Sequence, residues 1–323
     1  MQVHTFQTAA VFQRNAETIS VVILNYNKRE FLAKCIASVL EIDWPNLDVI
    51  VVDNASSDGS AEMVKSEFPN RVRLITREVN SPTAGRNQGF AAAKGEFVLS
   101  IDNDIVLPDK HVLQKGIDLL RRFPSVGLLA FKIGTVDRPD EPLPEHWWYP
   151  LPLEKWKDRF FYTDFFSEGA VLFRAEMLAE TGGYDDDFFQ YFESVDLSLR
   201  IIRDGFDMLY CPVLTCAELR VRGFLPRKRT PINYLSLRNR LWVVWKHYPL
   251  GRGIRFALGR ILIAGVRSVR YGWVDYFVRG VKDGIAAPRT IRAKRRPLDE
   301  KTWKRIKEIR QGRVCAVDYR TEA

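Results

Sequence analysis

The order of strand-like and helix-like segments restricts the fold of this chain more than any other feature. Short β-branched apolar runs that end in turn-forming residues predict buried strands, and apolar residues spaced three and four apart between them predict helices. The predicted strands are residues 18–27, 47–53, 71–79 and 96–104. The predicted helices are residues 29–42, 59–68, 83–95 (with Gly95 as its C-cap) and 110–123. Four such repeats predict βαβ units and a mostly parallel sheet.

Polar residues stand at the ends of these predicted strands. Asn25 and Asp53 close the first two strands, and Asp102 and Asp104 close the fourth. Ligands of parallel α/β sheets bind at the carboxyl ends of the strands. We therefore expect these four side chains to share one edge of the sheet.

The tripeptide Asp102-Asn103-Asp104 places two carboxylates on the same side of an extended chain, because side chains alternate with period two. A divalent cation held between them and a diphosphate relieves their repulsion, and Mg²⁺ and Mn²⁺ prefer such oxygen ligands. A solvated turn is the alternative for an isolated Asp-X-Asp. The position at a strand end favours the metal site, so Mn²⁺ or Mg²⁺ is the expected cofactor.

The regular alternation ends after the next apolar run, near residue 135. Residues 137–165 are rich in proline and aromatic residues and predict an irregular excursion over one face of the sheet. A strand, a helix and a Gly-Gly turn follow, and residues 193–205 predict an amphipathic helix. The expected parts of the chain are an N-terminal extension (1–17), an α/β catalytic domain (18–226) and a basic, amphipathic helical region (227–323).

The formal net charge of +9 is distributed unevenly. Residues 1–218 hold 22 Lys and Arg against 33 Asp and Glu, whereas residues 219–314 hold 26 basic and 5 acidic residues. Such asymmetry predicts a polyanionic partner, either a membrane surface or nucleic acid. In the basic region Trp, Tyr, Phe and Leu recur at helical spacing between the cations, which favours an anionic membrane surface. The alternatives are nucleic-acid binding and helices that only pack on the catalytic domain.

The cysteines and the N-terminus indicate a cytoplasmic location. Cys35, Cys211, Cys216 and Cys315 have no paired or metal-type spacing, which fits reduced thiols. The first 20 residues lack the basic start and apolar core of a signal peptide. No run reaches the roughly 18 uncharged apolar residues that span a bilayer. We expect a protein that does not cross the membrane and that binds peripherally to its inner face.

Several segments resemble, in order, the blocks of family 2 glycosyltransferases, with the closest similarity to the rhamnosyltransferase-like branch that builds bacterial surface polysaccharides. The resemblance covers about residues 18–248. The segments are "ISVVILNYNKREFLAKCIASVL", "VIVVDNASSDGS", "TAGRNQGFAAAKGEFVLSIDNDI", "GAVLFRAEMLAETGGYDDDFFQYFESVDLSLRIIRDGF" and "INYLSLRNRLWVVWKH".

The resemblance implies a GT-A fold, which is a Rossmann-like, mostly parallel sheet flanked by helices. It also implies inverting, metal-dependent transfer from a nucleotide-diphosphate sugar to a glycan or polyprenyl-linked acceptor. Asn25 and Asp53 would hold the nucleoside, and Arg86 would lie near the base or the diphosphate. Asp102 would face the ribose and the metal, and Asp104 would be the principal metal ligand.

The position of the general base departs from the family pattern. Members of the family usually carry a Glu-Asp pair at the start of a helix, and the Asp is the base. Here the pair reads Glu193-Ser194, and a serine cannot take that role. Glu193 and Asp196 share a helix face and are the two candidates, of which we prefer Glu193. The alternative is that both acids only favour the helix N-terminus electrostatically.

A second departure lies at Glu218, where the family commonly has a histidine that completes the metal site. Glutamate is an acceptable oxygen ligand, so we expect Glu218 beside Asp102 and Asp104, with a surface acid as the alternative. The two departures leave open a non-catalytic scaffold that binds nucleotide sugar or glycan. A sugar nucleotidyltransferase is disfavoured because "LNYNKREF" lacks a Gly-rich basic loop. Nucleic acid is not an expected partner, and the sequence does not indicate the donor sugar, the linkage or the oligomeric state.

Overall fold

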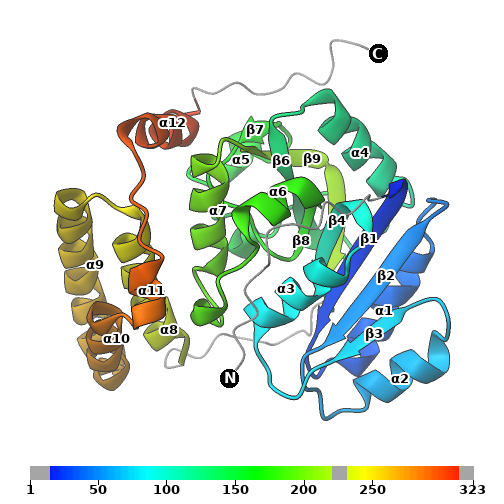
Figure 1. Ribbon diagram of the computed structural model, residues 1–323, viewed down its shortest axis with the longest axis horizontal. Helices are drawn as coiled ribbons and strands as arrows, with labels where there is room; N and C mark the ends of the chain where they lie inside the picture. Colours follow the sequence, from blue (N-terminus) through cyan, green and yellow to red (C-terminus); the bar gives the residue numbers. More distant parts are fainter. Residues whose placement is uncertain (1–14, 220–230, 313–323) are drawn as a thin grey trace.

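The computed structural model describes residues 15–219 and 231–312, in which a central sheet carries helices on both faces and the C-terminal helices lie to one side (Figure 1). The described strands are β1 (Asn15–Asn25), β2 (Leu47–Asp53), β3 (Arg73–Thr76), β4 (Gly95–Asp102), β5 (Ile105–Val106), β6 (Val126–Thr135), β7 (Phe161–Tyr162), β8 (Ala170–Arg174) and β9 (Asp207–Glu218). The helices of the first part are α1 (Arg29–Leu40), α2 (Ser60–Glu67), α3 (Pro82–Ala92), α4 (Val112–Arg122), η1 (Pro144–His146), α5 (Leu153–Trp156), α6 (Ala175–Thr181), η2 (Asp186–Phe188) and α7 (Glu193–Arg203). The C-terminal helices are α8 (Pro231–His247), α9 (Leu250–Tyr271), α10 (Val274–Ala286), α11 (Arg289–Ala293) and α12 (Glu300–Arg310).

The sheet is mostly parallel, as the sequence predicts. Its order is β3-β2-β1-β4-β8-β6-β9-β5, with β7 paired to β9. The pairs β1–β2, β1–β4, β2–β3 and β6–β9 are parallel, whereas β8 runs antiparallel between β4 and β6, and the two-residue strands β5 and β7 pair antiparallel with β9. The parallel half is therefore the strand–helix alternation of the first 102 residues, and β8 joins it to the second half.

Each strand supplies two apolar faces because its side chains alternate. Val21 and Ile23 of β1 belong to the core that α1, α2 and α4 cover, whereas Val22 between them belongs to the core that α3, α6, α7 and α8 cover. Strands that are buried on both faces read as continuous apolar runs, which is why these segments are recognisable in the sequence.

Several predicted boundaries need correction. The strand predicted over residues 71–79 is Arg73–Thr76, and the strand predicted over residues 96–104 ends at Asp102, so that Asp104 follows it. The first strand begins at Asn15, so three residues assigned to the N-terminal extension belong to the sheet; residues 1–14 lie outside the described part. The third helix ends at Ala92, and Gly95 is not its C-cap but the first residue of β4. A Cβ at Gly95 would lie 2.6 Å from both Ser20 N and Thr18 O, so glycine is needed for the close approach of β1.

The strand register brings the predicted polar residues to one edge. Asn25 pairs with Asp53 across β1–β2, and Leu24 pairs with Asp102 across β1–β4. The antiparallel strand β8 begins at the same edge, where the backbone N–H of Asp102 donates to the carbonyl of Gly169 at 3.1 Å. The carboxyl ends of three parallel strands and the entry of β8 therefore meet.

The described C-terminal helices form a layer beside α7. Helix α8 packs on α7 and contributes Trp242 and Val243 to the core, while α9 and α10 lie farther from the sheet (Figure 1). The predicted division between residues 226 and 227 lies outside the described residues. Among the helices described, none is long and apolar enough to cross a membrane.

Candidate active site

The first group of polar side chains at the carboxyl edge joins the ends of β1 and β2. Asn25 donates through Nδ2 to Asp53 Oδ1 at 2.8 Å and to Ser56 Oγ at 3.1 Å. Asn25 Oδ1 accepts from Asn103 Nδ2 at 2.6 Å, and Asp53 Oδ2 accepts from the backbone N–H of Ser56 at 3.1 Å. Two of the predicted side chains, Asn25 and Asp53, are thus in one buried network with Asn103, which was not predicted to be part of the site.

Close packing of α3 on β1 brings Arg86 to this edge. A Cβ at Gly89 would lie 2.3 Å from Val22, so glycine is needed there, and one at Gly85 would lie 2.7 Å from the end of the Leu24 side chain, which would have to move. These two residues flank Arg86 in "AGRNQG". The spacing of the motif therefore has a packing reason as well as a chemical one.

Arg86 forms an ion pair with Asp102 and donates to Ser100 Oγ at 3.0 Å. Burial opposes the charge, but Asp102 and then Glu168 raise the pKa of Arg86, so the guanidinium stays protonated. A fixed cation beside a carboxylate at the edge of the sheet suits a ligand that carries phosphate.

Asp104 lies beside Asp102 and faces a lysine. Its side chain pairs with Lys28, which is partly exposed. Burial first, then Asp102 and Glu218, raise the pKa of Asp104, while Lys28 opposes the shift. The carboxylates of Asp102, Asp104 and Glu218 thus repel one another at this edge of the sheet.

Glu218 reaches the same point from β9. It is opposite Ile105 in the β5–β9 pair, and the next backbone N–H, that of Leu219, donates to Asp104 O at 2.7 Å. Its Oε2 lies 3.2 Å from His146 Nε2, and the other ring nitrogen of His146 lies 2.9 Å from Ser167 Oγ. Residues 137–165 therefore bring His146 beside Glu218, the position at which the family commonly has a histidine.

Asp102, Asp104 and Glu218 suit a hard divalent cation chemically, because their carboxylate oxygens are the ligands that such a cation prefers and because the three like charges repel one another. Within residues 15–219 and 231–312, however, no group of three or more His, Cys, Asp or Glu side chains is arranged to hold a metal ion directly. Asp102 and Asp104 are instead turned toward Arg86 and Lys28. Binding a cation here requires these two carboxylates to turn from their present partners.

Glu193, the first residue of α7, lies close to the same edge and has a carboxyl neighbour that the sequence analysis missed. Glu193 is 6% exposed, and burial raises the pKa of Glu193 and of its neighbour Glu168. Their charges act on Arg86, which connects them to the Asp102 group. Glu168 directly precedes the strand "GAVLFR", but only the antiparallel direction of β8 places it at the carboxyl edge.

The loop that leads to Glu193 has an unusual backbone. Phe189, Tyr191 and Phe192 have φ of +64°, +67° and +68°, which non-glycine residues rarely adopt. Asn239 of α8 is fully buried and donates through Nδ2 to the carbonyls of Phe188, Gln190 and Tyr191 at 3.0, 2.8 and 2.6 Å. Strained backbone held by a dedicated side chain is typical of functional sites.

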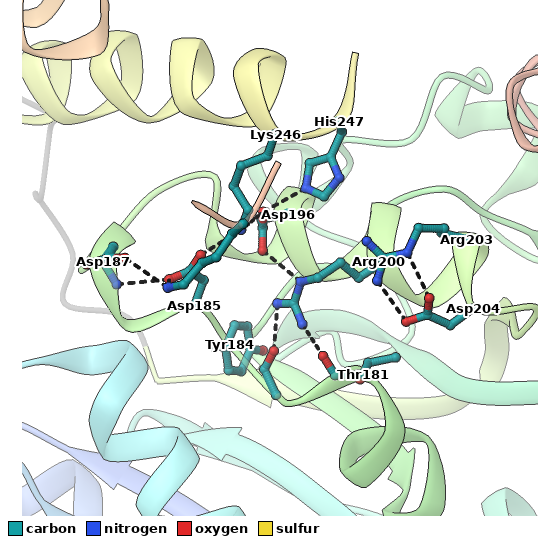
Figure 2. A network of polar contacts seen from close by, with 12 residues as sticks. Thr181, Tyr184, Asp185, Asp187, Asp196, Arg200, Arg203, Asp204, Lys246 and His247 are labelled. Carbon is teal, nitrogen blue, oxygen red and sulfur yellow. Dashed lines mark hydrogen bonds and ion pairs between the residues drawn. The ribbon is translucent and has the colours of Figure 1, made fainter. Parts of the chain in front are cut away.

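Asp196, the other candidate base, faces away from the edge toward α8. Its carboxylate is fully buried and contacts Arg200 Nε at 2.9 Å, Lys246 Nζ at 2.5 Å and His247 Nε2 at 2.8 Å (Figure 2). Burial opposes ionisation, but Arg200 and Lys246 hold the pKa of Asp196 well below its usual range. A carboxylate enclosed by cations is a weak base without access to substrate, so these contacts favour a structural role.

Two of the three consecutive acids before the loop, Asp185 and Asp187, belong to the same network. Lys246 Nζ lies 2.6 Å from Asp185 (Figure 2). Lys294 Nζ lies 2.6 Å from Asp185 and 2.8 Å from Asp187. Asp186 instead accepts from Asn87 Nδ2 at 2.7 Å. The acids thus join the C-terminal helices to the catalytic part.

Comparisons with known proteins agree with this geometry. The family model described as "Glycosyl transferase family 2" matches residues 20–182. The chain is 32% identical over 100 residues to glycosyltransferase GlyG of Streptococcus pneumoniae, and 35% identical over 103 residues to poly(ribitol-phosphate) beta-glucosyltransferase of Bacillus spizizenii. The match to GlyG covers 30% of this chain and 33% of GlyG. The match to the glucosyltransferase covers 30% of this chain and 16% of that relative. The matches thus span about a third or less of these curated relatives.

Solved structures share the fold over most of the chain. Mannosyltransferase PcManGT of Pyrobaculum calidifontis, in complex with GDP-Man and Mn²⁺, covers 91% of this chain and 85% of its own with a TM-score of 0.54 and 17% identity. The match to S. aureus TarS 1–349 in complex with UDP-GlcNAc covers 92% of this chain and 88% of TarS 1–349, with a TM-score of 0.56 and 16% identity. The fold is therefore GT-A, as expected from the sequence.

Proposed function

Because the chain belongs to glycosyl transferase family 2, we propose that it transfers a sugar from a nucleotide-diphosphate sugar to a glycan or lipid-linked acceptor with inversion. One observation carries the proposal. The carboxyl edge of the sheet gathers hydrogen-bonding side chains suited to a nucleoside, carboxylates suited to a cation, and a buried glutamate suited to act as base. The relatives that act on surface polymers support a role in surface-polysaccharide synthesis.

The donor site in this proposal consists of the residues at the ends of β1, β2 and β4. Asn25 and Asp53 hold the base or ribose, since their network is already ordered. Arg86 and Asp102 lie at the diphosphate and ribose. A preformed, buried set of polar groups binds its ligand with little ordering cost.

Asp102 and Asp104, with Glu218 as a third oxygen ligand, would hold Mn²⁺ or Mg²⁺. A divalent cation at this position neutralises the negative charge that the leaving nucleoside diphosphate gathers. Lys28 is close enough to Asp104 to be displaced toward the diphosphate and to add a second positive charge there. The fold shared with a mannosyltransferase that holds GDP-Man and Mn²⁺ supports this assignment.

Glu193 is the general base of the proposed reaction. It accepts the proton of the attacking acceptor hydroxyl while the hydroxyl oxygen displaces the diphosphate from the anomeric carbon. The raised pKa of Glu193 favours this role because it makes the carboxylate a better proton acceptor.

An anionic membrane surface is the proposed location of the acceptor side. Helix α9 has no acidic residue and exposes Ile254, Leu258, Leu262, Val266 and Val269, which fall on one helix face at steps of four, four, four and three. Exposed arginines flank this row. Helices of this kind bind in lipid headgroups with the apolar face inserted, and this supports a peripheral location on the inner face of the plasma membrane.

Nucleoside diphosphate release from UDP-, dTDP-, GDP- and CDP-sugars, with Mn²⁺ and a polyprenyl-linked acceptor, tests the proposal. We expect release from one donor, and a reduction of about 10²–10⁴-fold in Glu193→Gln with donor binding retained. Donor binding without transfer or hydrolysis in the wild type would contradict catalysis. It would favour a non-catalytic scaffold, which Ser194 already makes the second candidate.

A further inference from the structure

A pocket of about 490 Å³ lies at the end of β6, in the irregular segment 137–165. Its wall begins at Thr135, the last residue of β6, and continues through Leu143 and Pro144 to Leu153 of α5. The volume is within the range of sites that bind small molecules. Among the described residues that line it, none belongs to the proposed donor, metal or base positions.

Backbone contacts hold the wall of this pocket against the end of the sheet. The backbone N–H of Leu143 donates to Ile133 O at 2.9 Å, and that of Arg138 donates to Thr135 O at 3.0 Å. A Cβ at Gly134 would lie 2.3 Å from Arg138 O, so glycine is needed for this close approach. The pocket is therefore formed before a ligand arrives, which keeps the ordering cost of binding small.

The pocket adjoins the proposed active site on the side away from the nucleoside position. Thr135 is paired with Glu218 across β6 and β9. The first residue of η1 lines the pocket, and its last residue is His146, whose Nε2 lies 3.2 Å from Glu218 Oε2. In the sheet order, β4 and β8 separate β6 from β1, so the Asn25–Asp53 network lies beyond them. A ligand in this pocket is thus beside the reacting groups but apart from the nucleoside network.

The charged side chains that line the pocket are of both signs and form two pairs. Arg138 Nη1 lies 3.1 Å from Glu141 Oε2, and Lys157 Nζ lies 3.9 Å from Glu154 Oε2. Arg138, Glu141 and Glu154 are largely exposed, and exposed pairs contribute little to stability. The pairs can therefore open at small cost and offer donors and acceptors to a ligand, while their balanced charge favours neither an anion nor a cation.

The remaining surface of the pocket includes the apolar side chains of Leu143, Pro144 and Leu153. A sugar ring matches this combination, because its hydroxyl groups donate and accept hydrogen bonds and its C–H groups pack on apolar side chains. A phosphate ester would require an excess of cations, and a lipid chain would require a lining without charges. An uncharged sugar is the class of ligand that the lining fits.

We propose that this pocket is a glycan subsite, which holds an uncharged sugar residue of the acceptor other than the residue whose hydroxyl reacts. The inference rests on the proposed glycosyl transfer. It adds that recognition of the acceptor extends from the reacting hydroxyl into the segment 137–165.

A substitution that fills the pocket tests the subsite. Leu153→Trp places a larger side chain in the pocket, and Lys155→Trp, at an exposed position of α5 outside the pocket lining, is the matched control. The probes are an array of neutral and acidic mono- to tetrasaccharides of bacterial surface polysaccharides. We expect the wild type to bind a neutral oligosaccharide, Leu153→Trp to bind it at least about tenfold more weakly, and Lys155→Trp to bind it within about twofold of the wild type.

A double variant gives a second readout that does not depend on Leu153→Trp folding. Arg138→Ala with Glu141→Ala changes two exposed side chains and removes hydrogen-bonding groups from the pocket, so the same glycan should bind at least about threefold more weakly. The Kd of the nucleoside diphosphate, measured by calorimetry, should change less than about twofold in each variant, because the pocket is apart from the nucleoside network. With an acceptor that carries this glycan, KM should rise while kcat stays unchanged, because the subsite binds ground state and transition state equally.

Three results would overturn the inference: a glycan affinity unchanged in Leu153→Trp or in the double variant, binding of acidic glycans alone, or no binding of any glycan to the wild type. Failure of the proposed function looks different. In that case the wild type releases no nucleoside diphosphate from any of the four donor classes, while Leu153→Trp still weakens the binding of the neutral glycan.

Discussion

At the scale of single residues, the predictable part of the site is the part that lies at strand ends. Asn25, Asp53 and Asp102 each follow an apolar run, and parallel register brings the three together. Glu168 was not predicted because its place depends on β8 running antiparallel, which its apolar pattern does not encode. His146 lies in the irregular segment 137–165, and only the path of this segment in the fold brings it to Glu218.

Asp53 offers the clearest test of the nucleoside side. Replacing it by Ala removes a charged acceptor, and a hydrogen bond to a charged group is worth about 1.5–3 kcal/mol. We expect Asp53→Ala to weaken nucleoside diphosphate binding about 10- to 100-fold by calorimetry. Asp48→Ala is the matched control, because Asp48 lies near the start of the same strand at the opposite edge, where it pairs with Arg73. Equal weakening by both variants would count against the assignment.

At the scale of secondary-structure elements, α8 both completes the core and holds the loop before Glu193. Asn239→Ala would remove the side-chain donor of the Gln190 and Tyr191 carbonyls, whereas Phe188 O keeps its bond from Arg238, and we expect a loss of about 2–3 kcal/mol in the free energy of unfolding. Transfer should also slow, because the loop positions Glu193. Ile232→Ala, at an exposed site of the same helix, is the control. Urea unfolding and acceptor kinetics measure the two effects, and unchanged kinetics in a folded Asn239→Ala would refute the coupling.

The contact between α7 and α8 makes stability depend on pH through His247. Burial lowers the pKa of His247 in spite of Asp196, so the unfolded chain takes up a proton at higher pH than the folded protein. The His247 contribution is therefore complete above the unfolded pKa of about 6.5 and is lost as pH falls through the lower folded pKa. Through His247 alone, the free energy of unfolding changes by at most about 1.4 kcal/mol per pH unit.

Urea unfolding at pH 7.5 and 5.5 checks this dependence. We expect the wild type to lose more stability across this interval than His247→Gln, which does not titrate. The pKa of Asp196 is depressed in the folded protein, so Asp196 changes the stability only below its unfolded pKa of about 3.9. It therefore does not contribute to the loss between pH 7.5 and 5.5. Identical losses in the two proteins would show that His247 is not the responsible group.

At the scale of the whole molecule, the sequence predicted the class of fold and the order of most elements, because strands buried on both faces and amphipathic helices have distinct periods. It did not predict how the basic region attaches to the rest. The charge asymmetry predicts a polyanionic partner, yet the buried Lys246 pairs with Asp185 and Asp196, and the exposed Lys294 pairs with Asp185 and Asp187 of the same chain. Long-range pairing of this kind has no local signature.

The exposed face of α9 gives a prediction for the molecule as a whole. Leu258→Asp with Leu262→Asp should reduce binding to vesicles that contain phosphatidylglycerol at least about tenfold, because it places charge where the helix inserts. Binding to phosphatidylcholine vesicles should be weak, and salt should weaken binding to the anionic ones. Val136→Asp, an exposed apolar site distant in sequence from α9, is the control. If the double variant and this control sediment equally with anionic vesicles, α9 is not the docking face.

The central claim is that the carboxyl edge of the sheet binds a nucleoside diphosphate through Asp104 and a divalent cation. Calorimetric titration of UDP, dTDP, GDP and CDP, with and without Mn²⁺, into the wild type and Asp104→Asn tests it most directly. The account predicts that one nucleotide binds in the presence of Mn²⁺ and that Asp104→Asn abolishes the dependence on the metal. Binding that is equally tight in both proteins, or no binding of any of the four nucleotides to the wild type, would contradict it.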